Sequence, residues 1–174
     1  SIRNGELHLG GFSELKLSNK EIGKIVVERP FFEKKIINFN INDNVAVRAF
    51  VVNMFEPKFF EVCPECKKKV IDSSCLKHGR VIPEKRVLLS LIIDDGTAST
   101  RATIFSEVLE KIMLKEELEN NELFSIKKND FLGKEIIVKG QVKKNSMFDN
   151  QDFIVSEIED VDLDKLIERL ESNI

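Results

Sequence analysis

The chain has 174 residues, and its 27 basic and 30 acidic side chains give a formal net charge of -3. Its three closely spaced cysteines are not typical of a secreted disulfide scaffold, and no apolar run reaches the roughly 18 residues of a membrane span. The slightly negative charge argues against a protein that binds a polyanion over its whole surface.

The first 35 residues carry weak structural signals. Apolar and polar residues alternate loosely from Leu7 to Leu17, which predicts a short strand pair or the closing strand of a preceding domain. The polar residues that follow predict a linker at 19–35, so we expect the main domain at 36–174. Because the chain starts at Ser1 and not at a methionine, we expect a fragment of a longer protein.

Five strands are predicted in the main domain. The first covers 44–55, where residues alternate between two faces of the strand and both faces carry apolar side chains. One face carries Val45, Val47, Ala49 and Val51, and the other carries Ala46, Arg48, Phe50, Val52 and Met54. The remaining strands are predicted at 87–93, 99–105, 135–144 and 152–159, with a turn at 94–97 between the second and third.

Two helices accompany these strands. After the third strand, Ser106 is a candidate N-cap, and the apolar residues that follow predict one helix to about Leu118, then a polar connection. A C-terminal helix is predicted at 162–174, with an apolar stripe of Leu163, Leu166, Ile167, Leu170 and Ile174. This stripe could cover the open end of its own domain or contact other subunits, because an amphipathic stripe looks the same in both cases.

The segment between the first two strands carries a metal-binding pattern. Its C-x2-C-x8-C-x2-H spacing uses all three cysteines and one histidine: Cys63, Cys66, Cys75 and His78. Four such donors can form a closed tetrahedral site, which predicts one structural zinc ion, with a redox-active dithiol as the alternative. The lobe at 57–86 has too few apolar residues to order itself, so we expect zinc to supply its folding free energy.

The order of the predicted elements indicates a fold class. Five strands with a helix between the third and fourth is the order of the OB-fold, a small Greek-key barrel, although other five-stranded barrels share this pattern. We therefore expect a mainly β protein: a five-stranded OB-fold barrel with a zinc-ribbon insertion between strands 1 and 2, a helix between strands 3 and 4, and a C-terminal helix.

Aromatic and basic residues occur together at two places in this domain. On the third strand Phe105 shares a face with Arg101, and Phe148 follows Lys143 and Lys144 in the loop after the fourth strand. Bases stack on exposed aromatic rings while Lys and Arg hold the phosphates, so these residues are candidates for binding single-stranded nucleic acid. Arg48 on the first strand is a further candidate for neutralising phosphates.

Three stretches of the sequence carry a family resemblance. The run 60–70, the second cysteine–histidine knuckle, and the turn 94–97 leading into 101–107 resemble replication protein A, namely the zinc-containing OB domain of its large subunit and archaeal single-chain relatives. The resemblance implies that Phe105 and Phe148 stack on bases and that Arg101 contacts DNA. The chain departs from the eukaryotic domain at His78, where that domain has a cysteine. By the same resemblance, residues 1–18 would be the tail of a preceding OB domain.

The leading hypothesis is sequence-tolerant binding of single-stranded DNA in replication, recombination or repair. The alternative is a subunit-assembly module of a replication protein A-like complex, with oligomerisation through the terminal helix and with protein subunits or sister OB domains as partners. An enzyme is not expected, because the sequence offers no phosphate-cradling glycine loop and no nucleophile beside a base. We expect no membrane, no small-molecule substrate, and a cytoplasmic (nucleoid-associated) or nuclear protein that is not secreted.

Overall fold

The computed structural model describes residues 30–145 and 151–172 and short pieces at 2–3, 6–7, 10–11, 13–14 and 16, the side chains of residues 2, 3, 6, 7, 165, 169 and 170 excepted. In the N-terminal pieces, β1 (Ile2–Arg3) and β2 (Glu6–Leu7) pair antiparallel, ahead of the strand pair predicted at 7–17. None of the helices in the described ranges is long and apolar enough to cross a membrane.

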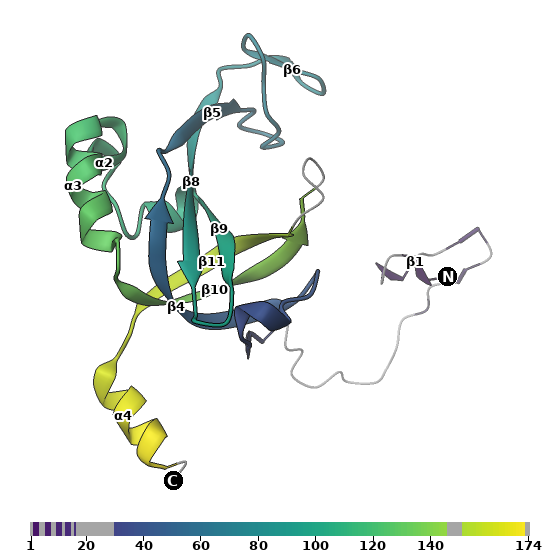
Figure 1. Ribbon diagram of the computed structural model, residues 1–174. Coiled ribbons are helices and arrows are strands. Elements are labelled where there is room, and N and C mark those ends of the chain that lie inside the picture. Colours follow the sequence, from purple (N-terminus) through teal and green to yellow (C-terminus); the bar gives the residue numbers. More distant parts are fainter. Residues whose placement is uncertain are drawn as a thin grey trace.

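Five long strands form the body of the molecule (Figure 1). They are β4 (Asn44–Met54), β8 (Glu84–Asp94), β9 (Ser99–Phe105), β10 (Glu135–Lys144) and β11 (Gln151–Asp160). Their pairings form a closed circuit in the order β4, β10, β11, β9, β8 and back to β4. Only the β9–β11 pairing in this circuit is parallel. All five strands were predicted from the sequence to within a few residues.

The core lies inside this circuit, because alternate side chains of every strand point inward. The predicted apolar face of β4 is buried from Val45 to Val51, and it packs with inward residues of the other strands, such as Leu89, Ile104 and Phe153. Met54, which strict alternation places on the outward face, is only 1% exposed. The reason is a bulge, since the register with β8 shifts between Val51 and Asn53 and reverses the facing of the residues that follow.

Gly140 occupies a second irregularity, where the register between β10 and β11 shifts. A Cβ atom at this position would meet the carbonyl oxygen of Ile154 at a separation that real Cβ atoms do not reach, and the Phe153 ring at 3.0 Å. Gly140→Ala is therefore expected to lower the free energy of unfolding by about 3 kcal/mol, the upper end for overpacking, because a backbone carbonyl cannot rotate away. Urea unfolding measures this loss, and Gln141→Ala on the next residue is the control. Equal stability of the two variants would contradict the close approach.

The connection between β9 and β10 differs from the prediction. A single helix from Ser106 to about Leu118 is wrong: the structure has α1 (Ser106–Leu109), α2 (Lys115–Glu119) and α3 (Asn121–Phe131). The expected polar connection is largely α3, whose N-cap Asn120 accepts hydrogen bonds from the N–H groups of Glu122 and Leu123 at 2.9 and 3.2 Å. This helix buries Phe124 and Phe131 against the strands, so packing and capping outweigh its polar composition.

Residues before β4 close one end of the strand circuit. β3 (Phe32–Glu33), within the stretch predicted as a linker, pairs parallel with β4, and the short helix η1 (Ile36–Asn38) follows it. The Asp95 carboxylate accepts a hydrogen bond from the backbone N–H of Ile36 at 2.8 Å, which ties η1 to the β8–β9 turn. Burial raises the pKa of Asp95, but hydrogen bonds from Thr97 and nearby N–H groups outweigh burial and lower it overall.

Candidate metal centre and nucleic-acid interface

The chain between β4 and β8 forms a separate lobe, seen at the top of Figure 1. It begins with β5 (Lys58–Val62), which pairs antiparallel with the start of β8, and it contains the small hairpin β6 (Ser74–Cys75) and β7 (Gly79–Arg80). Apart from its cysteines, its buried apolar residues are few: Val62 and Val70 are buried, and Val81 is partly buried. The lobe therefore has little hydrophobic stabilisation of its own.

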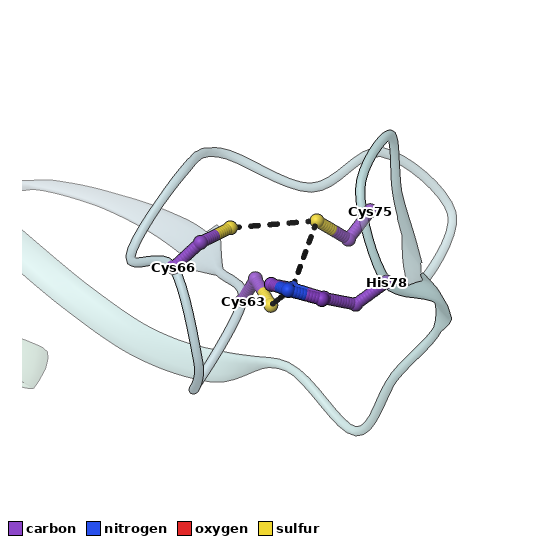
Figure 2. A group of neighbouring side chains, drawn as sticks. All are labelled: Cys63, Cys66, Cys75 and His78. Atoms are coloured by element: carbon purple, nitrogen blue, oxygen red, sulfur yellow. Dashed lines mark hydrogen bonds between the residues drawn. The ribbon is translucent and has the colours of Figure 1, made fainter.

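The four predicted metal ligands meet inside this lobe (Figure 2). Their ligand atoms all lie within 4.8 Å of one another. The Cys66 and Cys75 sulfurs are 3.5 Å apart, and His78 Nδ1 lies 3.3 Å from Cys63 Sγ and 3.8 Å from Cys75 Sγ. Since Zn–S bonds of about 2.3 Å place two sulfurs of a tetrahedron roughly 3.8 Å apart, these separations fit one zinc ion.

The surroundings of the sulfurs favour thiolates at two of the three cysteines. The N–H of Cys66 lowers the pKa of Cys63, and the N–H groups of Lys77 and His78 lower that of Cys75. At Cys66 the N–H of Lys68 has the same effect, but burial and the other two sulfurs outweigh it and raise the pKa. Metal ligation requires all three thiols in their deprotonated form, and a cation at the centre would offset the effects that raise the pKa of Cys66.

The imidazole of His78 has a second contact on its outer side. Its Nε2 lies 3.4 Å from a carboxylate oxygen of Glu65, one of the two residues between the cysteines of the first knuckle. Nδ1 thus faces the sulfurs and Nε2 faces a carboxylate, the arrangement by which an acidic side chain orients a metal-binding histidine. With four protein donors and two of the cysteines buried, the site has the closed character of a structural centre.

Ion pairs join the lobe to the rest of the molecule at the start of β8. Glu84 accepts from Lys67 at 2.6 Å and from Arg86 at 3.0 Å, and Arg86 also donates to Glu107 in α1. The hydrogen bond from Lys67 is the main cause that lowers the pKa of Glu84. Together with the β5–β8 pairing, these contacts hold the base of the lobe beside α1.

The candidate nucleic-acid interface is the outward surface of β8 and β9. Ala102 and Ile104 are fully buried, so the intervening side chains of β9, including Arg101 and Phe105, point away from the core. Arg101 donates to the Ser90 hydroxyl at 3.0 Å, and its guanidinium lies 5.4 Å from the centre of the Phe55 ring. These two contacts fix the position of the Arg101 side chain on this surface.

The remaining predicted residues lie elsewhere. Arg48 is on the outward side of β4, opposite Ile137 of β10, and its Nε is 3.3 Å from Glu135. Lys143 and Lys144 are exposed at the end of β10, and Phe148 lies outside the described residues. The structure therefore brings Arg101 and Phe105 onto one surface, while Arg48, Lys143 and Lys144 lie on β4 and β10.

Phe55 is a further residue of this surface, to which the sequence pattern assigns no role. Its ring is 39% exposed and lies beneath Arg101. Its backbone N–H donates to the carbonyl of Ser90 at 2.9 Å, which fixes it beside β8. The position of Phe55 directly after the first strand was a signal in the sequence. Its orientation could not be predicted, because the bulge in β4 reverses the alternation before it.

The predicted C-terminal helix is α4 (Leu163–Glu171). Figure 1 shows α4 projecting from the end of β11 away from the closed strands. Leu163 is 64% exposed, Ile167 is 53% exposed and Leu166 is partly exposed, while Ile174 lies outside the described residues, as does the side chain of Leu170. The described apolar side chains of this helix are thus accessible.

Comparison with solved structures identifies related folds. A chain of a replication protein A heterotrimer bound to single-stranded DNA matches with a TM-score of 0.59 and 22% identity, over 75% of this chain and 35% of that chain. Yeast replication protein A bound to single-stranded DNA matches with a TM-score of 0.56 and 18% identity, over 84% of this chain and 100% of that one. A scan of family models and a search of curated proteins found no match. The chain thus spans about a third of the first matched chain, and the likeness supports an OB-type fold.

Proposed function

We propose that this chain is a single-stranded DNA-binding module of the replication protein A type. In this proposal the five closed strands are an OB barrel, the lobe is a zinc ribbon inserted between its first and second strands, and the ligand crosses the outward surface of β8 and β9. One observation carries it: Arg101, held by Ser90 and by the Phe55 ring, shares this surface with Phe105. The matched chains of similar fold were determined bound to single-stranded DNA, which supports the same ligand here.

Each group on this surface has a role that follows from its chemistry. The rings of Phe105, Phe55 and Phe148 offer apolar faces on which bases stack without regard to sequence. The guanidinium of Arg101 pairs with a phosphate, and Arg48, Lys143 and Lys144 add positive charge along the path of the strand. Since stacking is sequence-tolerant, we propose a module that coats DNA during replication, recombination or repair.

Charge segregation along the chain supports a ligand of this kind. Residues 57–86 hold eight Lys or Arg against four acids, and residues 127–144 hold six against two. The acidic surplus lies at 107–123, which includes α1 and α2, and at 149–174, which includes α4. The net charge of -3 is therefore no obstacle to a basic binding surface.

Fluorescence anisotropy of an end-labelled deoxythymidine oligonucleotide tests the proposal. A label on the DNA is needed because the protein has no tryptophan. We expect binding whose affinity falls steeply with salt, with a logarithmic slope of about 0.7 for each phosphate neutralised on a single strand. Absence of binding at low salt, or binding that salt does not weaken, would contradict a phosphate-dependent module.

The exposed face of α4 supports a second candidate function, assembly of several copies of the chain through this helix. Leu163 and Ile167 lie one helical turn apart, and both are more than half exposed. We expect the wild-type chain to self-associate and the double variant Leu163→Glu, Ile167→Glu to sediment as a monomer in analytical ultracentrifugation. Binding of oligonucleotide should survive in this variant. A wild-type chain that stays monomeric at its highest soluble concentration would contradict assembly of identical copies.

A further inference from the structure

A hollow of about 400 Å³ opens beside the proposed interface, between η1 and the first residues of β9 and β11. Its apolar side is formed by Ile36, Phe39 and Ala98. Ile36 and Phe39 belong to the segment that closes this end of the strands, and both are buried. Ile36, Phe39 and Ala98 thus form an apolar wall of the hollow.

The separation of two strands explains why this space exists. β9 and β11 are paired only where Ala102 and Thr103 face Phe153 and Ile154. Earlier along both strands the described residues form no such pairs, so β9 and β11 part and leave the space between them. Its volume lies at the small end of the roughly 300–1,000 Å³ typical of ligand pockets.

The hollow also has polar lining residues. Ser99 and Thr100 carry hydroxyl groups, and Gln151 carries a side-chain amide. These groups can both donate and accept hydrogen bonds, as the edge of a nucleobase requires. Arg101 also borders the hollow, and the same residue lies over Phe55 on the outward surface. The hollow therefore adjoins the outward surface at Arg101.

We propose that this hollow receives one nucleobase of the bound strand, turned out of the stacked series. The apolar wall contacts the ring, Gln151 and Thr100 bond to its edge, and Arg101 holds the adjacent phosphate. The inference rests on the proposed function and refines it: stacking on the outward surface tolerates any sequence, while this one position selects among bases. A side-chain amide that forms two hydrogen bonds with the edge of one base favours that base over the others by about fivefold or more in affinity.

Anisotropy with dA, dC and dT homopolymers of one length tests this selectivity. We expect the wild-type chain to favour one homopolymer by about fivefold or more, and we expect Gln151→Ala and Thr100→Val to reduce that preference. The salt dependence should stay unchanged, because neither side chain carries charge. Gln141→Ala, which removes an amide on β10 that does not line the hollow, should leave the preference intact. Melting temperatures of all variants separate this effect from loss of folding.

The outcomes distinguish the two levels of the proposal. A wild-type chain that binds all homopolymers equally, or a preference that survives in Gln151→Ala and Thr100→Val, overturns the base pocket and leaves the DNA-binding surface standing. A wild-type chain that binds no oligonucleotide overturns both.

A fluorescent base locates the occupant directly. 2-Aminopurine placed at successive positions of an oligonucleotide can be observed without interference, because the protein contains neither tryptophan nor tyrosine. We expect one position to differ from its neighbours in emission with the wild-type chain and to resemble them with Gln151→Ala. Uniform emission along the strand would overturn the proposal.

Discussion

Replacing Phe105 with alanine is expected to weaken binding of a single-stranded oligonucleotide by about 5- to 150-fold. Loss of one stacked base on an aromatic ring costs about 1–3 kcal/mol, which corresponds to this range. Phe105 carries the ring on the outward surface of β9, on the same side of the strand as Arg101. Anisotropy at fixed salt measures the change. The dependence on salt should be retained, since the substitution removes no charge.

Phe59 provides a matched control for this substitution. Its partner on β8 is the inward-facing Val87, whereas the partner of Phe105 is Leu88, so the two rings lie on opposite faces of the sheet. Phe59 is 39% exposed and lies 4.6 Å from the ammonium group of Lys85. Phe59→Ala should therefore bind DNA as the wild type does. Equal losses of affinity in both variants would point to a general loss of structure. Unchanged affinity in Phe105→Ala would contradict the role of Phe105 as a stacking platform.

The five long strands were predictable because each has one face in the core. Strict alternation of apolar residues leaves only one register that buries them, as from Val45 to Val51 in β4. The inward orientation of the Met54 side chain was not predictable. The one-residue bulge before it reverses the alternation, and the residue types there do not signal a bulge. The OB-type order of elements followed from the strands, and the likeness to solved structures supports it.

The connection between β9 and β10 is a segment that local sequence patterns do not predict correctly. α3 reads as polar in sequence, and only two of its residues, Phe124 and Phe131, are buried. Its stability depends on strands distant in the chain and on the Asn120 cap, so composition alone underestimates it. Similarly, the bond from Ile36 to Asp95 joins residues far apart in sequence, and no local pattern reports such a contact.

The two candidate sites also differ in how well local sequence predicts them. Spacing alone brought the three cysteines and His78 together, because two short knuckles leave the chain little freedom to place their donors. The nucleic-acid surface depends on which way exposed side chains face. Alternation placed Arg101 and Phe105 correctly on one side of β9, but it could not reveal that Phe55, beyond the bulge, lies under the arginine.

Removal of the proposed zinc ion is expected to unfold the lobe at 57–86 and to leave the closed strands folded. Structural zinc contributes roughly 10–16 kcal/mol to the folding of small zinc domains, far more than the few buried valines of this lobe can supply. The core inside β4 and β8–β11 is a separate cluster of buried residues that includes none of the metal ligands. Hydrogen exchange should therefore show lost protection in the lobe and retained protection in these strands.

Two substitutions separate metal binding from other effects at the same centre. Cys75→Ser removes one soft donor and should bind less than one zinc ion per chain, with the exchange pattern of the metal-free protein. His78→Cys is the matched control, since it exchanges one normal zinc ligand for another and should retain one ion per chain. Zinc content by mass spectrometry under native conditions reports both. Full protection of the lobe in the metal-free wild type would show that its own packing suffices, and loss of protection throughout the strands would show that lobe and strands fold as one unit.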